Sequence, residues 1–143
     1  MDGQSVISCR VSASGPGLKL SIRVDDQTFF EGDPYQAGEI RCAISDDQPG
    51  DHRLKLVLSG KTRRHTQIDD LGQILHDITA TIDQVAFDDI PLGHLMVTNA
   101  EYTHDRNGTA PETQEKFYGT MGCNGTVTLP FTTPIYLWLL ENM

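Results

Sequence analysis

Apolar and polar residues alternate along four stretches of this chain, and this period of two is the feature that most constrains its fold. The stretches are LKLSIRV (18–24), EIRCAI (39–44), HRLKLVLSG (52–60) and TVTLPF (126–131). Successive side chains of an extended strand point to opposite faces, so each stretch predicts a β-strand with one buried face. The apolar faces, and hence the expected core, comprise Leu18, Leu20, Ile22, Val24, Ile40, Cys42, Ile44, Leu54, Leu56, Leu58, Val127, Leu129 and Phe131.

Turn-forming residues separate these strands. They occur in SGPG (14–17), DDQ (25–27), EGDPY (31–35) and DDQPGD (46–51). Short strands with regular turns are typical of an all-β sandwich, and the alternation predicts a hairpin in VDDQTFF with Asp25 and Asp26 near its tip. No linker or repeat divides the chain, so we expect one antiparallel, jelly-roll-like β-sandwich over residues 1–143.

Two further segments are less regular. DITATIDQVAFDDIPL (77–92) is strand-like, but its apolar residues change phase, which predicts a β-bulge near Asp83 and Gln84. A helix is the alternative there, and the β-branched residues argue against it. In PIYLWLLENM (134–143), Pro134 could open a helix or precede a closing strand. We expect a strand, because the edges of the sandwich need cover.

The charge and the terminal sequences limit the partners. The formal net charge is -9, and an acidic surface repels phosphate backbones and anionic lipid, so nucleic acid and membranes are not expected partners. The start of the chain lacks the basic and apolar regions of a signal peptide, which predicts synthesis in a cytoplasm. Cys9, Cys42 and Cys123 form no C-x-x-C pair, so we expect free, mostly buried thiols rather than a zinc site.

Asn-Gly-Thr occurs twice, at Asn107 and at Asn124. Both match the glycosylation sequon, but without a secretion signal they predict turns, since Asn-Gly favours hairpins. Asn124 lies between two alternating runs and is expected at a hairpin tip. Asn107 lies in a long polar loop behind Asp105, and loops of this kind on a rigid sandwich often carry binding sites.

Carboxylates gather at the predicted turns, as Asp pairs at 25/26, 46/47, 69/70 and 88/89. Asp105 and Asn107, two residues apart, could contribute two oxygen ligands to calcium. The stretch DRNGTAPETQEK is not an EF-hand loop, because its twelfth residue is Lys116. A calcium site at Asp105 and Asn107 is therefore one interpretation, and simple turn formation is the other.

Adjacent aromatic residues predict rings that face solvent. Phe117 and Tyr118 would point to opposite sides of a strand, as would Phe29 and Phe30. A wet ring beside carboxylates and amides is the usual chemistry of sugar binding. This predicts a glycan site formed by Tyr102, Asp105, Asn107 and Tyr118. No nucleophile elbow, P-loop or dinucleotide fingerprint is present, so we do not expect an enzyme.

The segment from residue 18 to residue 92 resembles small jelly-roll carbohydrate-binding modules, in particular the calcium-dependent xylan-binding type. The resemblance lies in LKLSIRVDDQTFFEGDPYQAGEIRCAI, DHRLKLVLSGK and the run formed by Ile78, Ile82, Val85, Asp88 and Ile90. It implies a non-enzymatic sandwich that binds glycan, and it leaves calcium assistance open. The dense Asn-Asp motif of those modules is missing, so no binding residue is transferred.

The C-terminal third, with HDRNGT and FYGTMGCNGTVTLPFTTPIYLWLLENM, is similar to short stand-alone proteins of marine bacteriophages. That resemblance implies synthesis in a host cytoplasm and a role in the virion or at the host surface. The alternative to glycan binding is therefore a virion structural protein: a capsid decoration, tail or fibre component. In that role the second face of the sandwich and IYLWLL would pack against further copies of the chain or against a capsid shell.

Overall fold

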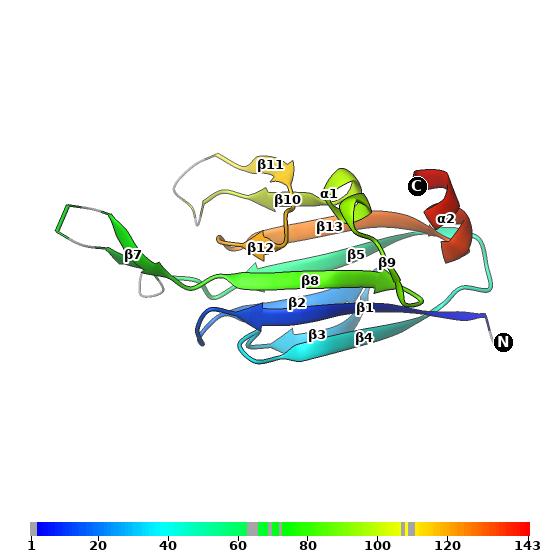
Figure 1. Ribbon diagram of the computed structural model, residues 1–143, viewed down its shortest axis with the longest axis horizontal. Coiled ribbons are helices and arrows are strands. Elements are labelled where there is room, and N and C mark those ends of the chain that lie inside the picture. Colours follow the sequence, from blue (N-terminus) through cyan, green and yellow to red (C-terminus); the bar gives the residue numbers. More distant parts are fainter. Residues whose placement is uncertain (1–2, 63–65, 69, 72, 107, 109–110) are drawn as a thin grey trace.

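Two antiparallel β-sheets pack face to face and form a sandwich (Figure 1). The computed structural model describes residues 3–62, 66–68, 70–71, 73–106, 108 and 111–143. The five-stranded sheet has the order β12 (Thr120–Met121), β8 (Ala80–Phe87), β1 (Gln4–Ala13) and β4 (Gly38–Ser45), with β9 (Ile90–Pro91) also paired to β8. The six-stranded sheet has the order β11 (Thr113–Lys116), β10 (Glu101–His104), β13 (Gly125–Thr133), β5 (Gly50–Ser59), β2 (Lys19–Val24) and β3 (Gln27–Gly32). The predicted all-β sandwich is confirmed.

Two short strands and two helices complete the described fold. Strands β6 (Thr66–Ile68) and β7 (Ile74–Asp77) pair as a two-stranded arm that projects from one end of the sandwich (Figure 1). Helices α1 (His94–Asn99) and α2 (Ile135–Asn142) lie toward the opposite end (Figure 1). None of the helices in the described part of the chain is long and apolar enough to cross a membrane.

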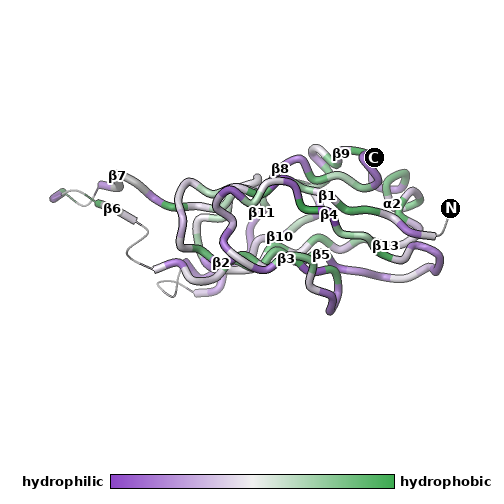
Figure 2. Tube along the Cα trace, turned by 90° about the horizontal axis from the view of Figure 1, so that it is seen from below, coloured by the Kyte–Doolittle hydropathy of each residue, from purple (hydrophilic) through white to green (hydrophobic). Residues whose placement is uncertain are grey.

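The core lies between the two sheets. The predicted inward residues of β2, β5 and β13 are all buried, and Ile40 on β4 is half-buried. Figure 2 shows the resulting change between hydrophobic and hydrophilic residues along the sandwich strands. Phe87 of the five-stranded sheet joins the layers, because its ring centroid lies 5.3 Å from that of Phe131 and 5.4 Å from that of Trp138. Apolar burial of this kind is the main favourable contribution to folding.

Both predicted local features of the strands are present. The β1–β8 register shifts between the pairs Ser8–Ala86 and Arg10–Asp83, so Gln84 and Val85 lie opposite Cys9, and Gln84 has a positive φ of 53°. This is the expected bulge. Strands β2 and β3 form the expected hairpin, with Asp25 and Asp26 in the turn between them.

The C-terminal segment is a helix, so the prediction of a closing strand was wrong. Pro134 stands at the N-cap of α2, where its missing N–H removes no helical hydrogen bond. Ile135, Trp138 and Leu139 are the buried residues, at the i, i+3 and i+4 spacing of one helix face. The segment has no period-two alternation, and this was the signal that favoured a helix.

Asn124 and Gly125 do not form a hairpin tip, so that prediction was also wrong. Strand β12 pairs with β8 in one sheet and β13 pairs with β10 and β5 in the other, so residues 122–124 cross between sheets. Gly125 is required by close approach rather than by turn geometry. A Cβ there would collide with the carbonyl oxygen of Thr103 and lie 2.9 Å from the Cβ of His104.

The cysteines are free, as expected. Cys9 and Cys42 are buried, and Cys123 is half-buried. Burial raises the pKa of Cys9 to about 12 and that of Cys42 to about 11. These two thiols therefore stay protonated at neutral pH and act as small apolar core residues.

Candidate functional site

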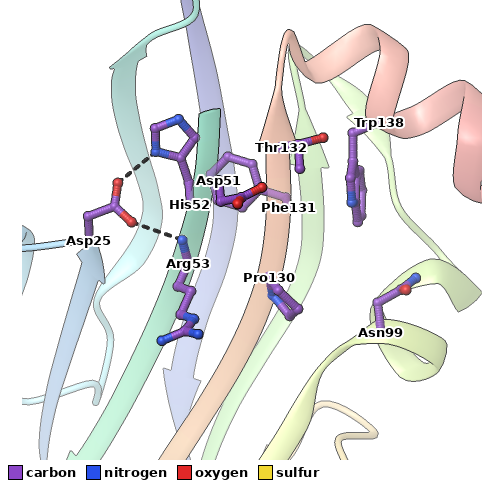
Figure 3. A pocket seen from close by; sticks show the side chains of 9 residues that line it. All are labelled: Asp25, Asp51, His52, Arg53, Asn99, Pro130, Phe131, Thr132 and Trp138. Atoms are coloured by element: carbon purple, nitrogen blue, oxygen red, sulfur yellow. Dashed lines mark hydrogen bonds and ion pairs between the residues drawn. The ribbon is translucent and has the colours of Figure 1, made fainter. Parts of the chain in front are cut away.

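A hollow of about 510 Å³ lies on the six-stranded sheet, beside α1 and α2 (Figure 3). Its walls combine apolar rings with charged and amide side chains. They come from the β2–β3 turn, β5, α1, β13 and α2: Asp25, Asp51, His52, Arg53, Asn99, Pro130, Phe131, Thr132 and Trp138. We refer to this feature as the helix-side hollow.

The pairing of β5 with β13 places these side chains. Arg53 lies opposite Pro130, and Asp51 lies opposite Thr132, so these four residues share the outer face of the sheet. The pair between them in the register, His52 and Phe131, points to the inner face, where the two rings stack with centroids 5.4 Å apart. The hollow therefore has a polar outer rim and an aromatic floor.

A chain of hydrogen bonds fixes His52. Its Nδ1 lies 2.7 Å from Asp25 Oδ2, and its Nε2 lies 3.1 Å from Thr133 Oγ1. Burial alone would raise the pKa of Asp25, but the hydrogen bonds from His52 and from the Arg53 backbone N–H outweigh it and hold this pKa below its ordinary value. The Asp25 carboxylate thus stays ionised and positions the imidazole.

The order Thr133, His52, Asp25 is similar to that of a hydrolytic triad, yet the threonine is not placed as a nucleophile. Thr133 is only 4% exposed, and its hydroxyl donates a hydrogen bond to the Gln48 carbonyl oxygen at 2.7 Å. A triad nucleophile must instead present its oxygen to the substrate. We interpret this chain of hydrogen bonds as support for the wall of the hollow.

Three polar side chains of the hollow have groups left to offer a ligand. Asp51 and Arg53 are exposed, and neither side chain makes a hydrogen bond or ion pair with the residues that the structure describes. Asn99 donates from Nδ2 to the Leu95 carbonyl oxygen at 2.9 Å, which leaves its Oδ1 as an acceptor. A carboxylate, an amide oxygen and a guanidinium are therefore available beside Trp138 and Pro130.

The sequence-predicted residue Tyr102 is an interior residue. It is 6% exposed, its hydroxyl donates to the Cys123 carbonyl oxygen, and it accepts from the Cys123 N–H at 2.9 Å. Burial raises the pKa of this phenol to about 12. Its ring packs against Phe117, with centroids 6.3 Å apart, and against His104. Tyr102 therefore stabilises the core and the segment 122–124, which crosses between the sheets. Its ring is not available to a ligand.

The other predicted residues lie apart from one another. Asp105 borders a second, polar hollow of about 610 Å³ with Glu112 and Asn124, and its Oδ1 accepts the Gly108 N–H at 2.8 Å. Asn107 lies outside the described residues. Tyr118 is 77% exposed, as expected beside the buried Phe117, but it borders a third, apolar hollow of about 250 Å³. The described members of the predicted set are thus distributed over the interior and two different hollows.

The described residues around Asp105 do not fit a calcium ion well. No group of three or more His, Cys, Asp or Glu side chains converges within the described part of the chain. Asn124 Oδ1 accepts the Lys61 N–H at 2.9 Å, and one Asp105 oxygen is engaged with Gly108, whereas calcium takes six to eight oxygen ligands. The calcium site at Asp105 and Asn107 stays a prediction, and melting with and without added calcium would test it.

No protein-family model matches this chain, and comparison with curated proteins and with solved structures gives no match either.

Proposed function

We propose that this protein is a non-enzymatic glycan-binding β-sandwich and that a sugar unit sits in the helix-side hollow. The observation that supports this best is the combination of apolar and polar groups there. Trp138, Phe131 and Pro130 offer C–H and ring surface, while Asp51 and Asn99 offer oxygen acceptors beside them. Sugars carry apolar C–H faces and hydroxyl donors, so they match such a surface.

The shape of the site suits one or two sugar units. Trp138 and Phe131 are 6% and 2% exposed, so they form a floor and do not provide a broad stacking platform. The elements that carry the site are strands and a helix packed on the core, and little ordering is needed before binding. Preorganisation of this kind reduces the entropic cost of binding.

The Asp51→Asn substitution should weaken glycan binding about tenfold, because it replaces a charged acceptor of sugar hydroxyls with a neutral amide; charged hydrogen bonds contribute roughly 1.5–3 kcal/mol. Its side chain is exposed, so the melting temperature should stay unchanged. A glycan array identifies a ligand, and isothermal titration calorimetry then compares the dissociation constants.

Asp26→Asn is the matched control, since Asp26 is also exposed and lies in the β2–β3 turn but does not line the hollow. It removes the same charge and should leave the dissociation constant unchanged. Equal affinities of wild type and both variants for a glycan found on the array would place the ligand elsewhere. An array without signal above background would contradict glycan binding itself.

A structural role in a phage virion is the second candidate, and α2 favours it. Helix α2 leaves an apolar side in solvent, with Tyr136 62%, Leu137 43%, Leu140 66% and Met143 80% exposed. Figure 2 shows this C-terminal helix among the hydrophobic segments. An apolar patch of this kind marks an interaction surface, and packing against a second copy would cover it.

Light scattering of the purified protein over a range of concentrations tests this second candidate. A structural subunit should form a stable oligomer that Leu140→Glu dissociates, because the substitution places a charge in the covered face. A monomer at the highest concentration, unchanged by Leu140→Glu, would count against the structural role. It would leave the glycan-binding proposal untouched.

A further inference from the structure

Three cations gather on the outer face of the six-stranded sheet, next to the helix-side hollow. Arg23 on β2 lies directly opposite Lys55 on β5, and Arg53 is two residues along β5 from Lys55 on the same face. Opposite residues have Cβ atoms about 4.5–5.5 Å apart, and residues two apart on a strand are separated by about 7 Å. We call Arg23, Lys55 and Arg53 the basic cluster.

The cluster forms no ion pair with the residues that the structure describes. Arg23 donates from Nε to Ser21 Oγ at 2.9 Å, a neutral partner. Neither Arg53 nor Lys55 forms a side-chain ion pair with any described residue. Lys19, on the same face of β2, differs, since it pairs with Glu31 at 3.3 Å.

Two acidic residues lie near the cluster and offset part of its charge. Asp25 is ionised and attracts Lys55, while its oxygens accept hydrogen bonds from His52 and from the Arg53 backbone. Asp51 lies two residues beyond Arg53 along β5, at the far end of the hollow from Lys55. In a chain with 11 basic and 20 acidic residues, such a cluster is unusual and marks a place where an anion is favoured.

We propose that the glycan is acidic: a polysaccharide with carboxylate or sulfate groups, one unit of which sits in the helix-side hollow while neighbouring units place their anionic groups on the basic cluster. This inference rests on the proposed glycan binding. Arg53 belongs to both features, so the cluster continues the hollow along β5 toward β2. A guanidinium binds a carboxylate or sulfate through two parallel hydrogen bonds, and the Lys55 ammonium adds a point charge.

Nucleic acid is a less suitable polyanion for this surface. The net charge of -9 opposes every polyanion alike, so it does not distinguish a nucleic acid from an acidic polysaccharide. Asp51 in the adjoining hollow can accept hydrogen bonds from hydroxyl groups, which each unit of a polysaccharide carries and the backbone of DNA lacks. An acidic glycan carries hydroxyl groups for the helix-side hollow and anionic groups for the basic cluster.

The test compares three probes by isothermal titration calorimetry at low and at physiological salt: an oligogalacturonate, a neutral xylo-oligosaccharide of equal length, and a single-stranded oligodeoxynucleotide. The variant is Arg23→Gln with Lys55→Gln, because neither residue lines the hollow. The matched control is Arg10→Gln with Arg41→Gln, which removes the same charge from exposed residues of the five-stranded sheet. All four positions lie on strand surfaces, and the folded state of each variant is checked by its melting temperature.

The oligogalacturonate should bind at least tenfold more tightly than the xylo-oligosaccharide, and added salt should weaken it. The Arg23/Lys55 variant should lose about tenfold or more in affinity for the oligogalacturonate and keep its affinity for the neutral sugar. The Arg10/Arg41 control should change neither dissociation constant appreciably.

Two outcomes would overturn this inference while glycan binding stands: equal affinity for the neutral and the acidic sugar, or an Arg23/Lys55 variant that binds oligogalacturonate like wild type. Tighter binding of the oligonucleotide than of the oligogalacturonate would overturn it in favour of a nucleic-acid surface. Absence of binding by both sugars would overturn the acidic-glycan inference and count against the proposed function, which the Asp51→Asn comparison and the glycan array test separately.

Discussion

Phe87→Ala should lower the free energy of unfolding by about 4 kcal/mol, as expected for a large-to-small change in a core. Phe87 is fully buried on β8, and its ring contacts Phe131 of the other sheet and Trp138 of α2. Deleting the ring opens a cavity where the two sheets and the helix meet. Urea unfolding followed by circular dichroism measures the loss.

Phe87→Leu is the control, because it keeps most of the buried volume and should cost less than about 1.5 kcal/mol. A Phe87→Ala protein as stable as Phe87→Leu would contradict the packing described for this junction. The junction also matters for the site, since Phe131 and Trp138 both line the hollow.

Lys61→Met should lower the free energy of unfolding by about 2 kcal/mol, because the Gly122 carbonyl oxygen loses this donor and the partly exposed Asp77 carboxylate loses this ion partner. The Lys61 side chain is 3% exposed; its Nζ lies 2.7 Å from Asp77 Oδ1 and donates to the Gly122 carbonyl oxygen at 2.5 Å. The Lys61 backbone also exchanges hydrogen bonds with the Asn124 amide. This residue therefore links the β7 arm to the crossing between the sheets.

Lys116→Met provides the comparison, since Lys116 is an exposed residue of the edge strand β11. Its unfolding free energy should differ from wild type by less than about 0.5 kcal/mol. Urea unfolding curves of the two variants, recorded under the same conditions, measure the contribution of Lys61 to stability. Similar midpoints for Lys61→Met and Lys116→Met would show that the buried ion pair contributes little.

The alternating strands could be predicted from sequence because burial on one face leaves a direct trace in the residue pattern. Leu54, Leu56 and Leu58 are 1–3% exposed, as their spacing predicts. The bulge at Asp83 and Gln84 was predictable for the same reason, since an extra residue shifts the phase of the alternation.

Strand β1 was not predicted, although its sequence carries the same period-two signal. Ile7, Cys9 and Val11 alternate with Ser8 and Arg10, and all three are buried. The apolar alternation stops at Ser5, which is nevertheless enclosed, with its hydroxyl 2.7 Å from Asp46 Oδ2 and 2.9 Å from Asp88 Oδ2. These two carboxylates lie far from Ser5 in the sequence, so the burial of Ser5 could not be predicted.

The helix-side hollow could not be predicted because distant segments build it. Asp51 and Arg53 come from β5, Asn99 from α1 and Trp138 from α2, and only the register of β5 with β13 brings them together. The sequence predictions for the site relied on the loop after Asp105, where local turn hydrogen bonds explain the Asp105 carboxylate. The sequence signals for the hollow were the polar residues on the outer face of β5 and the tryptophan near the C-terminus. They indicate a common site only when α2 is a helix, because the helix places Trp138 beside the β5 residues.

Trp138 offers the most direct measurement of the central claim, because it is the single tryptophan in the sequence and it lines the hollow. A glycan that binds, by calorimetry, should change the Trp138 fluorescence in a saturable way with the same dissociation constant. Asp51→Asn should move that midpoint about tenfold higher. A glycan that binds by calorimetry and leaves the Trp138 emission unchanged would show that the ligand sits elsewhere on the protein.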